Sequence, residues 1–563
     1  MLRPSLLKLR DHHFFFQFRV LYRVFLLRVI DLELLSSDGD PSRLLGQFAS
    51  VFCSLSFFCT FPVPFLIITR KPVPVPVAYM FEHFFIETTM TIAGLIGVLS
   101  WDAAFPDRRD RLVLGPLPVP SATLFLSKLA ALFAAPLLAA GAFNLFAGFG
   151  WPLVFAVGVG SKFSLLRTLP VYWLTVAAAA AFMIFMVLAV QGIAANLLPR
   201  QIFLRLSAVM QAIALCFLLS SYFLGPSFNS PAALNAQEHQ QILKWLPAYW
   251  FVGLFNQLNG SMHPELVPLA HRAWMALALS AAGALAAVFL SYFRMLPRIV
   301  EQPDIVPTLR SSFSFGSSLS SVITLFSLRT ILRSRQHRMI LSFYVGIGIT
   351  VIFGFTHTKF ARLTPSISPS QTTFLLSSIL AVFLAVVALR IVIAVPISLR
   401  ANWIFQATQV RPACLYHRAV RTSLLSLGVA PVVAILAVGF FVSDSFFVAG
   451  HLVIMALLGL MLVELCLFSF RKISFACSYL PGKANLHFAF WFTLLASIGW
   501  LKRAANAEAQ ILGSVSGFVL MGLCLASLAA ALHKFSSLQA QNSQQIIFEE
   551  EAVPEIVSLK LNS

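Results

Sequence analysis

Three glutamates and a histidine lie inside apolar stretches, where ionisable side chains are rare. Glu82, His83 and Glu87 lie in the run 78–101, and Glu464 lies in the run 446–469. A charged group is costly in a bilayer, so these four residues are candidates for a substrate or proton site. The commoner interpretation is hydrogen bonding between helices. Glu82 and Glu87 are five residues apart, so they do not share one helical stripe.

Other spacings that would carry chemistry do not occur. The segment Gly158-Val-Gly-Ser-Lys162 lacks the order of a phosphate-binding loop, and no H-E-x-x-H, G-x-S-x-G or metal-spaced Cys/His set is present. We therefore expect no enzyme, no metal and no cofactor bound by this chain. The seven cysteines form no C-x-x-C pair and are expected to be buried free thiols: Cys53, Cys59, Cys216, Cys414, Cys466, Cys477 and Cys524.

The composition places these residues in a membrane protein. Of the 563 residues, 59% are hydrophobic and 11% are charged, and the mean hydropathy is +0.85. A soluble domain is about half apolar and a quarter charged. In lipid, every backbone polar group must be paired internally, which leaves helices or a closed barrel. The apolar stretches lack period-two alternation, so the predicted fold is all-α and polytopic.

About twelve apolar runs are long enough to be transmembrane helices, and they divide into two halves of six. The predicted spans are 44–69, 78–101, 122–149, 168–192, 203–224 and 268–292, then 339–356, 372–396, 422–442, 446–469, 486–500 and 510–533. The predicted domains are 1–300, with an N-terminal interfacial helix, and 301–534; a polar cytoplasmic tail, 535–563, follows. Basic segments precede the first and the seventh span, which suggests parallel halves of the kind found in many transporters.

The basic residues give the orientation. The net charge of +19 would suggest nucleic acid in a soluble protein, but here arginines and lysines gather between apolar runs on alternate sides. This is the positive-inside bias of membrane proteins, and we expect no nucleic-acid partner. Both termini are predicted to be cytoplasmic, in a bacterial inner membrane.

Two segments outside the spans have amphipathic character. In residues 1–40, Phe14, Phe18, Leu21, Phe25, Val29 and Leu32 form one helical stripe, with Arg19 and Arg23 away from it. This favours a helix lying in the membrane surface, although it could instead pack on other helices of the protein. The long outer segment 225–267 contains an aromatic stretch, Trp245–Phe255, which predicts a second interfacial helix.

The segment after the second span carries the most specific pattern. Asp107, Arg108, Arg109, Asp110 and Arg111 are followed by Leu112 and Leu114, by the pair Pro118-Val119, and by Lys128 at the start of the third span. In this order and in the Pro118-to-Lys128 spacing, the chain resembles ATP-binding-cassette exporter permeases of the second type. The resemblance implies that the segment docks into a separate cytoplasmic ATPase subunit, which would use the ATP.

The pattern departs from that family in both halves. The usual Gly-Thr after the acidic cluster is absent, and Gly115-Pro116 is inserted. The equivalent segment of the second half, Arg400 to Arg411, has no lysine partner and matches by position only. A charged, proline-bounded segment can pair with a cytoplasmic protein and move two spans, whereas the simpler interpretation is that its arginines bind lipid headgroups.

Two other classes of protein remain as alternatives. Major-facilitator carriers also have six plus six spans and an Asp-Arg cluster after the second span, but Asp107–Arg111 lacks the preceding glycine. The N-terminal segment and the outer segment 225–267 also argue against that class. A lipid-modifying membrane enzyme would need a catalytic polar cluster, which the sequence does not contain.

Overall fold

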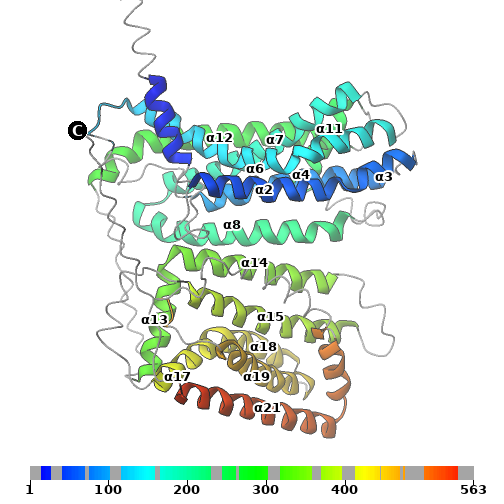
Figure 1. The fold of residues 1–563 in the computed structure, drawn as a ribbon, viewed down its shortest axis with the longest axis vertical. Helices are drawn as coiled ribbons and strands as arrows, with labels where there is room; N and C mark the ends of the chain where they lie inside the picture. The colour runs from blue at the N-terminus through cyan, green and yellow to red at the C-terminus, as the bar shows by residue number, and fades with distance from the viewer. Residues whose placement is uncertain are drawn as a thin grey trace, which may run out of the picture. The chain divides into compact units, whose positions relative to one another are not determined.

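The computed structural model describes the helical parts of the chain. These are residues 14–26, 41–69, 75–101, 114, 116–158, 165–229, 244–260, 266–301, 318–357, 369–395, 413–443, 446–468, 473–475, 500–501 and 503–542. The chain divides into two compact units, Met1–Thr308 and Leu309–Ser563. The regular elements within the described residues of both units are helical (Figure 1).

The first unit is built around one buried helix. Its elements are a helix over 14–26, α2 (Pro41–Thr60), α3 (Pro62–Thr69), α4 (Val75–Leu99), α6 (Ser121–Gly158), α7 (Leu165–Leu197), α8 (Arg200–Asn229), α11 (Pro247–Asn259) and α12 (Val267–Glu301). Helix α4 packs against α6, α7, α8 and α11. Its side chains at Ala78, Phe85, Ala93 and Val98 are almost fully buried, so α4 is the core of this unit.

The second unit has α15 at its centre. Its elements are α13 (Leu319–Arg333), α14 (Arg335–His357), α15 (Pro369–Ala394), α17 (Ala413–Leu424), the π-helical turn η4 (Leu425–Val429), α18 (Ala430–Ser443), α19 (Phe446–Leu467), a short helix over 503–511, and α21 (Val515–Asn542). Helix α15 packs on α14, α18, α19 and η4. Leu375, Leu380, Val386 and Val392 of α15 have no exposed surface.

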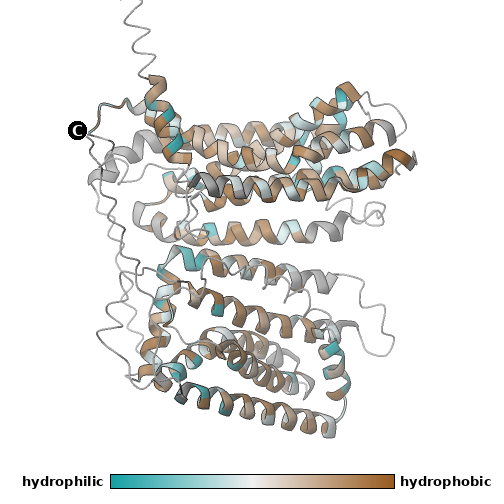
Figure 2. Cartoon of the chain, viewed as in Figure 1, coloured by the Kyte–Doolittle hydropathy of each residue, from teal (hydrophilic) through white to brown (hydrophobic). Residues whose placement is uncertain are grey.

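Length and apolarity identify a multi-pass membrane protein. Nine helices within the described residues are long and apolar enough to cross a bilayer, and brown, the colour of hydrophobic residues, predominates in most of them in Figure 2. They are Ala49–Ile68, Ala122–Ala156, Leu165–Leu197, Leu206–Phe223, Val267–Leu290, Phe374–Ala394, Cys414–Val438, Val448–Leu467 and Val515–Gln539. Helices α4 and α14 also coincide with predicted spans, 78–101 and 339–356, but are not among these nine. The twelve-span arrangement in two halves stays a prediction, and the predicted span 486–500 lies outside the described residues except for Trp500.

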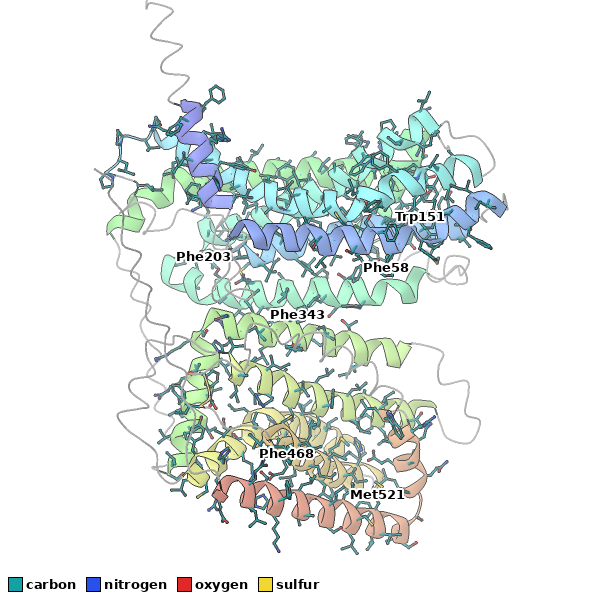
Figure 3. All side chains as sticks on the ribbon, in the orientation of Figure 1. Phe58, Trp151, Phe203, Phe343, Phe468 and Met521 are labelled. Carbon is teal, nitrogen blue, oxygen red and sulfur yellow. The ribbon has the colours of Figure 1, made fainter. Side chains whose placement is uncertain are left out.

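Several predicted spans have different ends in the structure. The run 44–69 is interrupted at Phe61, between α2 and α3, because Pro62 and Pro64 have no N–H for the helical ladder. The carbonyl of Cys59 near this break accepts a hydrogen bond of 3.2 Å from the Trp151 indole of α6. Figure 3 labels Trp151 and also Phe58, the residue before Cys59. The run predicted at 510–533 is wrong at its start, because the 503–511 helix ends and Ser514 caps a new helix, α21.

Small residues let α7 and α12 approach closely. A Cβ atom added to Gly192 of α7 would lie 2.4 Å from the Cβ of Ala287 of α12. Gly283 of α12 similarly faces Ala189 of α7 at 3.4 Å. Close backbone approach at small residues is the usual way in which helices associate in lipid, where no hydrophobic effect drives them together.

We therefore expect Gly192→Ala to destabilise the first unit by about 1–3 kcal/mol, because the two helices must separate to admit the methyl group. The matched control is Gly141→Ala in α6, where an added Cβ meets no atom within 4 Å. Thermal unfolding of both variants in detergent, followed by circular dichroism, measures the difference. Equal midpoints for the two variants would contradict the close contact.

Candidate functional site

The ionisable residues of α4 meet the outer-segment helix α11. Asn256 of α11 donates a hydrogen bond of 2.9 Å from Nδ2 to Glu82 Oε2. His83 Nδ1 lies 3.3 Å from Glu87 Oε2, one turn along α4. The His83 ring contacts the Tyr249 ring of α11 at 4.1 Å between centroids. Glu82 and His83 are buried, so two carboxyl groups and an imidazole share an enclosed region between these helices.

Local chain geometry holds α11 against this region. Pro247 begins the helix, and Gly260 ends it with a φ of 84°, which favours glycine. A Cβ at Gly253 would lie 2.8 Å from the backbone nitrogen of Ala270, so only glycine lets α11 pack this closely on α12. The aromatic segment was predicted as an interfacial helix. The helix is confirmed, but Phe251 and Phe255 are buried in the unit core.

Further along α4, polar side chains bind neighbouring helices. Asn144 of α6 donates to Thr89 Oγ1 at 2.8 Å and accepts at Oδ1 from the Tyr172 hydroxyl of α7 at 2.7 Å. Thr88 and Tyr222 of α8 lie 3.2 Å apart between their hydroxyl oxygens. These bonds tie α4 to three helices in surroundings where an unpaired polar group is costly.

The end of α4 is fixed by side chains of α7 and α8. The indole of Trp101 donates to Ser207 Oγ at 2.9 Å, and its carbonyl accepts from the Gln191 side chain. Gln211 donates to the carbonyl of Val98 at 2.7 Å. Trp101 is buried. These bonds satisfy carbonyl groups that a helix end leaves unpaired, so the chain enters the charged segment from a rigid anchor.

The other end of the charged segment is also anchored. The helix over 14–26 packs Leu21 and Phe25 on Ala131 of α6, with Leu114 and Val119 against them. Gln17 Nε2 donates to the carbonyl of Pro118 at 3.3 Å. The predicted apolar stripe of the N-terminal segment therefore packs on protein at Leu21 and Phe25.

Lys128 contributes to the same contact. Its Nζ lies 5.7 Å from the centroid of the Phe25 ring, a cation–π geometry. Of the residues predicted for ATPase coupling, Pro118, Val119 and Lys128 are thus brought together with the N-terminal helix. The remaining predicted residues lie outside the described part of the chain: Asp107, Arg108, Arg109, Asp110, Arg111, Leu112, Arg400 and Arg411.

Glu464 belongs to a separate cluster in the second unit. Arg421 of α17 approaches it with Nε at 2.7 Å from Oε1 and donates from Nη2 to Oε2 at 3.1 Å. His533 Nδ1 of α21 lies 2.8 Å from the same Oε1. Glu464 is 4% exposed, so its ion pair with Arg421 compensates its burial, and the cluster joins three helices. Glu464 therefore belongs to the second unit, whereas Glu82, His83 and Glu87 belong to the first.

Sequence reasoning missed a third polar cluster. His451 of α19 lies 2.5 Å from Ser378 Oγ of α15 and 2.6 Å from Glu508 Oε1 of the short helix 503–511. All three residues are buried. The one available signal was His451 itself, an imidazole inside the apolar run 446–469. Its partners are 73 and 57 residues away, and no spacing rule connects them.

Within the described residues, no group of three His, Cys, Asp or Glu side chains could hold a metal ion. The described cysteines are free thiols, among them Cys59 and Cys466, which are partly buried.

Comparison with known proteins gives no relative: no family model matches the chain, and neither the curated proteins nor the solved structures contain a match. The fold and the sites therefore define a multi-pass all-helical membrane protein.

Proposed function

We propose that the chain is the membrane permease of an ATP-driven exporter, with both six-helix domains on one polypeptide and a separate pair of cytoplasmic ATPase subunits. The observation that carries the proposal is the double anchoring of the charged segment 102–113. Trp101 is bonded to α7 and α8 on one side, and Val119 packs beneath the N-terminal helix on the other. A partner that moves this segment would move α4, α6, α7 and α8 as one body.

The electrostatics of the segment fit a docking role. Five charged residues, Asp107 to Arg111, stand between two fixed points and are followed by Leu117, which is 50% exposed. Alternating charges with an exposed apolar side chain suit a cleft of opposite pattern on a soluble protein. Both ends of the segment are held by buried contacts. A partner that binds the segment would therefore move the attached helices, and not only the segment itself.

Site-specific cross-linking tests this proposal without knowledge of the substrate. A photoreactive amino acid at position 109 should capture a soluble protein that mass spectrometry identifies as an ATP-hydrolysing subunit. The same amino acid at position 162, predicted to lie outside the membrane, is the matched control and should capture none. An ATPase captured equally at both positions, or at neither, would overturn the docking role of the segment.

A second function, proton-coupled secondary transport of the major-facilitator type, is favoured by one observation. Glu82 and His83 are buried in the first unit against Asn256 and Tyr249 of α11, and the partly buried Glu87 lies beside His83. Buried carboxyl–imidazole pairs in membrane helices are the usual proton carriers. A carrier of this kind should show proton flux in proteoliposomes without ATP, and Glu87→Gln should abolish that flux. An ATP-driven permease should show none in either form.

A further inference from the structure

We propose that Ser378, His451 and Glu508 form a proton-binding site that holds the short helix 503–511 against α15 and α19. The three residues come from three elements of the second unit. Ser378 lies near the start of α15, His451 lies near the start of α19, and Glu508 lies in the helix that precedes α21. The inference goes beyond the transport function and does not depend on the energy source that drives it.

The geometry leaves no room for solvent between the three groups. His451 Nε2 is 2.5 Å from Ser378 Oγ, and His451 Nδ1 is 2.6 Å from Glu508 Oε1. His451 has no exposed surface, and Ser378 and Glu508 are 2% exposed. Phe374 packs its ring 5.4 Å from the imidazole between centroids. The proton content of the cluster is therefore set by its own donors and acceptors.

The hydroxyl group fixes the state of one imidazole nitrogen. Ser378 Oγ lies 2.8 Å from the carbonyl oxygen of Phe374 and 2.9 Å from that of Leu375. Carbonyl oxygens only accept, so the single hydroxyl proton is directed to them. In the arrangement that keeps these two backbone bonds, His451 Nε2 donates to Ser378 and is protonated.

One further proton is needed on the other side of the ring. With Nε2 protonated, a hydrogen bond between Nδ1 and Glu508 Oε1 requires a proton on one of these two atoms. An imidazolium beside a carboxylate and a neutral imidazole beside a carboxylic acid contain the same number of protons. In both forms the cluster has no net charge.

Loss of that proton is costly in the closed structure. It places two acceptors 2.6 Å apart, unless the Ser378 hydroxyl turns from the backbone carbonyls towards His451. In either case a negative charge remains in buried surroundings. Glu508 Oε2 is buried and has no hydrogen-bond partner among the described residues, so nothing there compensates the charge. Movement of the helix 503–511 towards water would hydrate the negative charge and so lower its cost.

Other charged groups of the packed elements lie away from this cluster. On α15, Arg390 is twelve residues from Ser378, about 18 Å along the helix, and donates to the carbonyl of Cys466. On α19, Glu464 is occupied by Arg421. Arg503 of the short helix is exposed and lies over the Trp500 ring. On α21, His533 and Lys534 are near the opposite end, and His533 contacts Glu464.

Charged residues of the remaining packed helices are also placed elsewhere. His417 and Arg418 lie on α17 with Arg421, and the imidazole of His337 on α14 contacts Val395 at the end of α15. Helix α14 ends at His357, whose side chain is outside the described part, as are Asp444 and Lys502. The described charged side chains of these helices therefore form their contacts away from His451 and Glu508.

Hydrogen–deuterium exchange of the full chain in lipid nanodiscs tests the proposal. The measured quantity is the exchange rate of the peptide covering 503–511, divided by its intrinsic rate. It should rise about tenfold per pH unit above the pH at which the opened cluster releases its proton, because opening releases one proton. Glu508→Gln should remove this dependence, since an amide has no proton to lose. Glu87→Gln, which changes a partly buried acid of the first unit, is the matched control and should keep it.

Ser378→Ala provides a second test of the proposal if Glu508→Gln fails to fold. Without the hydroxyl, Nε2 is no longer required to donate, so the closed cluster should lose its proton more easily. The rise of exchange with pH should then be smaller than in the wild type and should level off at a lower pH. The proposal is overturned by an equal pH dependence in the wild type and Glu508→Gln. An unchanged rise in Ser378→Ala would overturn it as well.

Discussion

Glu464→Leu is expected to be among the most destabilising single substitutions in the second unit. It leaves the guanidinium of Arg421, whose side chain is 14% exposed, without the carboxylate that compensates its burial. Removing one partner of a buried ion pair costs roughly 3–5 kcal/mol, and the partial exposure of Arg421 places the expected loss at the lower end of that range. Reversible unfolding in mixed micelles, followed by tryptophan fluorescence or circular dichroism, measures it.

The double variant Arg421→Met/Glu464→Leu removes both charges at once. It therefore distinguishes the loss of the ion pair from the cost of leaving one charge buried alone. Replacing a buried pair by apolar side chains of similar size is often neutral, so the double variant should recover most of the stability that each single variant loses. Additive losses in the double variant would mean that the two side chains act independently and that the contact contributes nothing. His533→Ala should have a smaller effect, because His533 is 54% exposed.

Reversal of the charges in the segment Asp107–Arg111 is the second large expected effect. Changing Arg108, Arg109 and Arg111 to glutamate should abolish ATP-dependent export while the protein still inserts and folds. Close charge pairs at interfaces contribute about 2–5 kcal/mol each, so three reversed contacts would weaken docking by several orders of magnitude. Coupled ATP hydrolysis in proteoliposomes that contain both subunits measures the effect.

The control for this experiment is the double variant Lys502→Glu/Arg503→Glu. It reverses two neighbouring positive charges on the predicted outer side of the membrane. It changes the same type of residue at the membrane surface without touching the docking segment. If the arginines of 108–111 only bind lipid headgroups, both sets of reversals should reduce activity modestly and with the same dependence on anionic lipid. Full coupling in the 108–111 variant would contradict docking.

The helices could be predicted well because apolar length is a property of the local sequence. The predicted runs 122–149, 168–192 and 372–396 each lie within or overlap one long helix, α6, α7 and α15. Their ends could not be predicted with the same accuracy. Apolarity continues across the break at Phe61, and the turn at 512–513 interrupts a run that reads as one span. Prolines and capping serines decide these points.

The candidate sites depended on long-range packing and were recovered only in part. Glu82, His83 and Glu87 stood out because ionisable residues are rare in apolar runs, and the structure places them together. Asn256, which bonds Glu82, is 174 residues away, and Glu508 falls between the predicted spans 486–500 and 510–533. Which helices meet is set by shape and by small residues such as Gly192, so the partners of a buried side chain follow from the fold.

Purification of the tagged chain from its native host in mild detergent tests the central claim most directly. We predict that a soluble ATPase copurifies with the wild type, hydrolyses ATP in the complex, and is lost from the variant with Arg108, Arg109 and Arg111 changed to glutamate. A chain that purifies without any ATPase, and that transports on its own in proteoliposomes under a proton gradient, would contradict the permease function and favour the carrier.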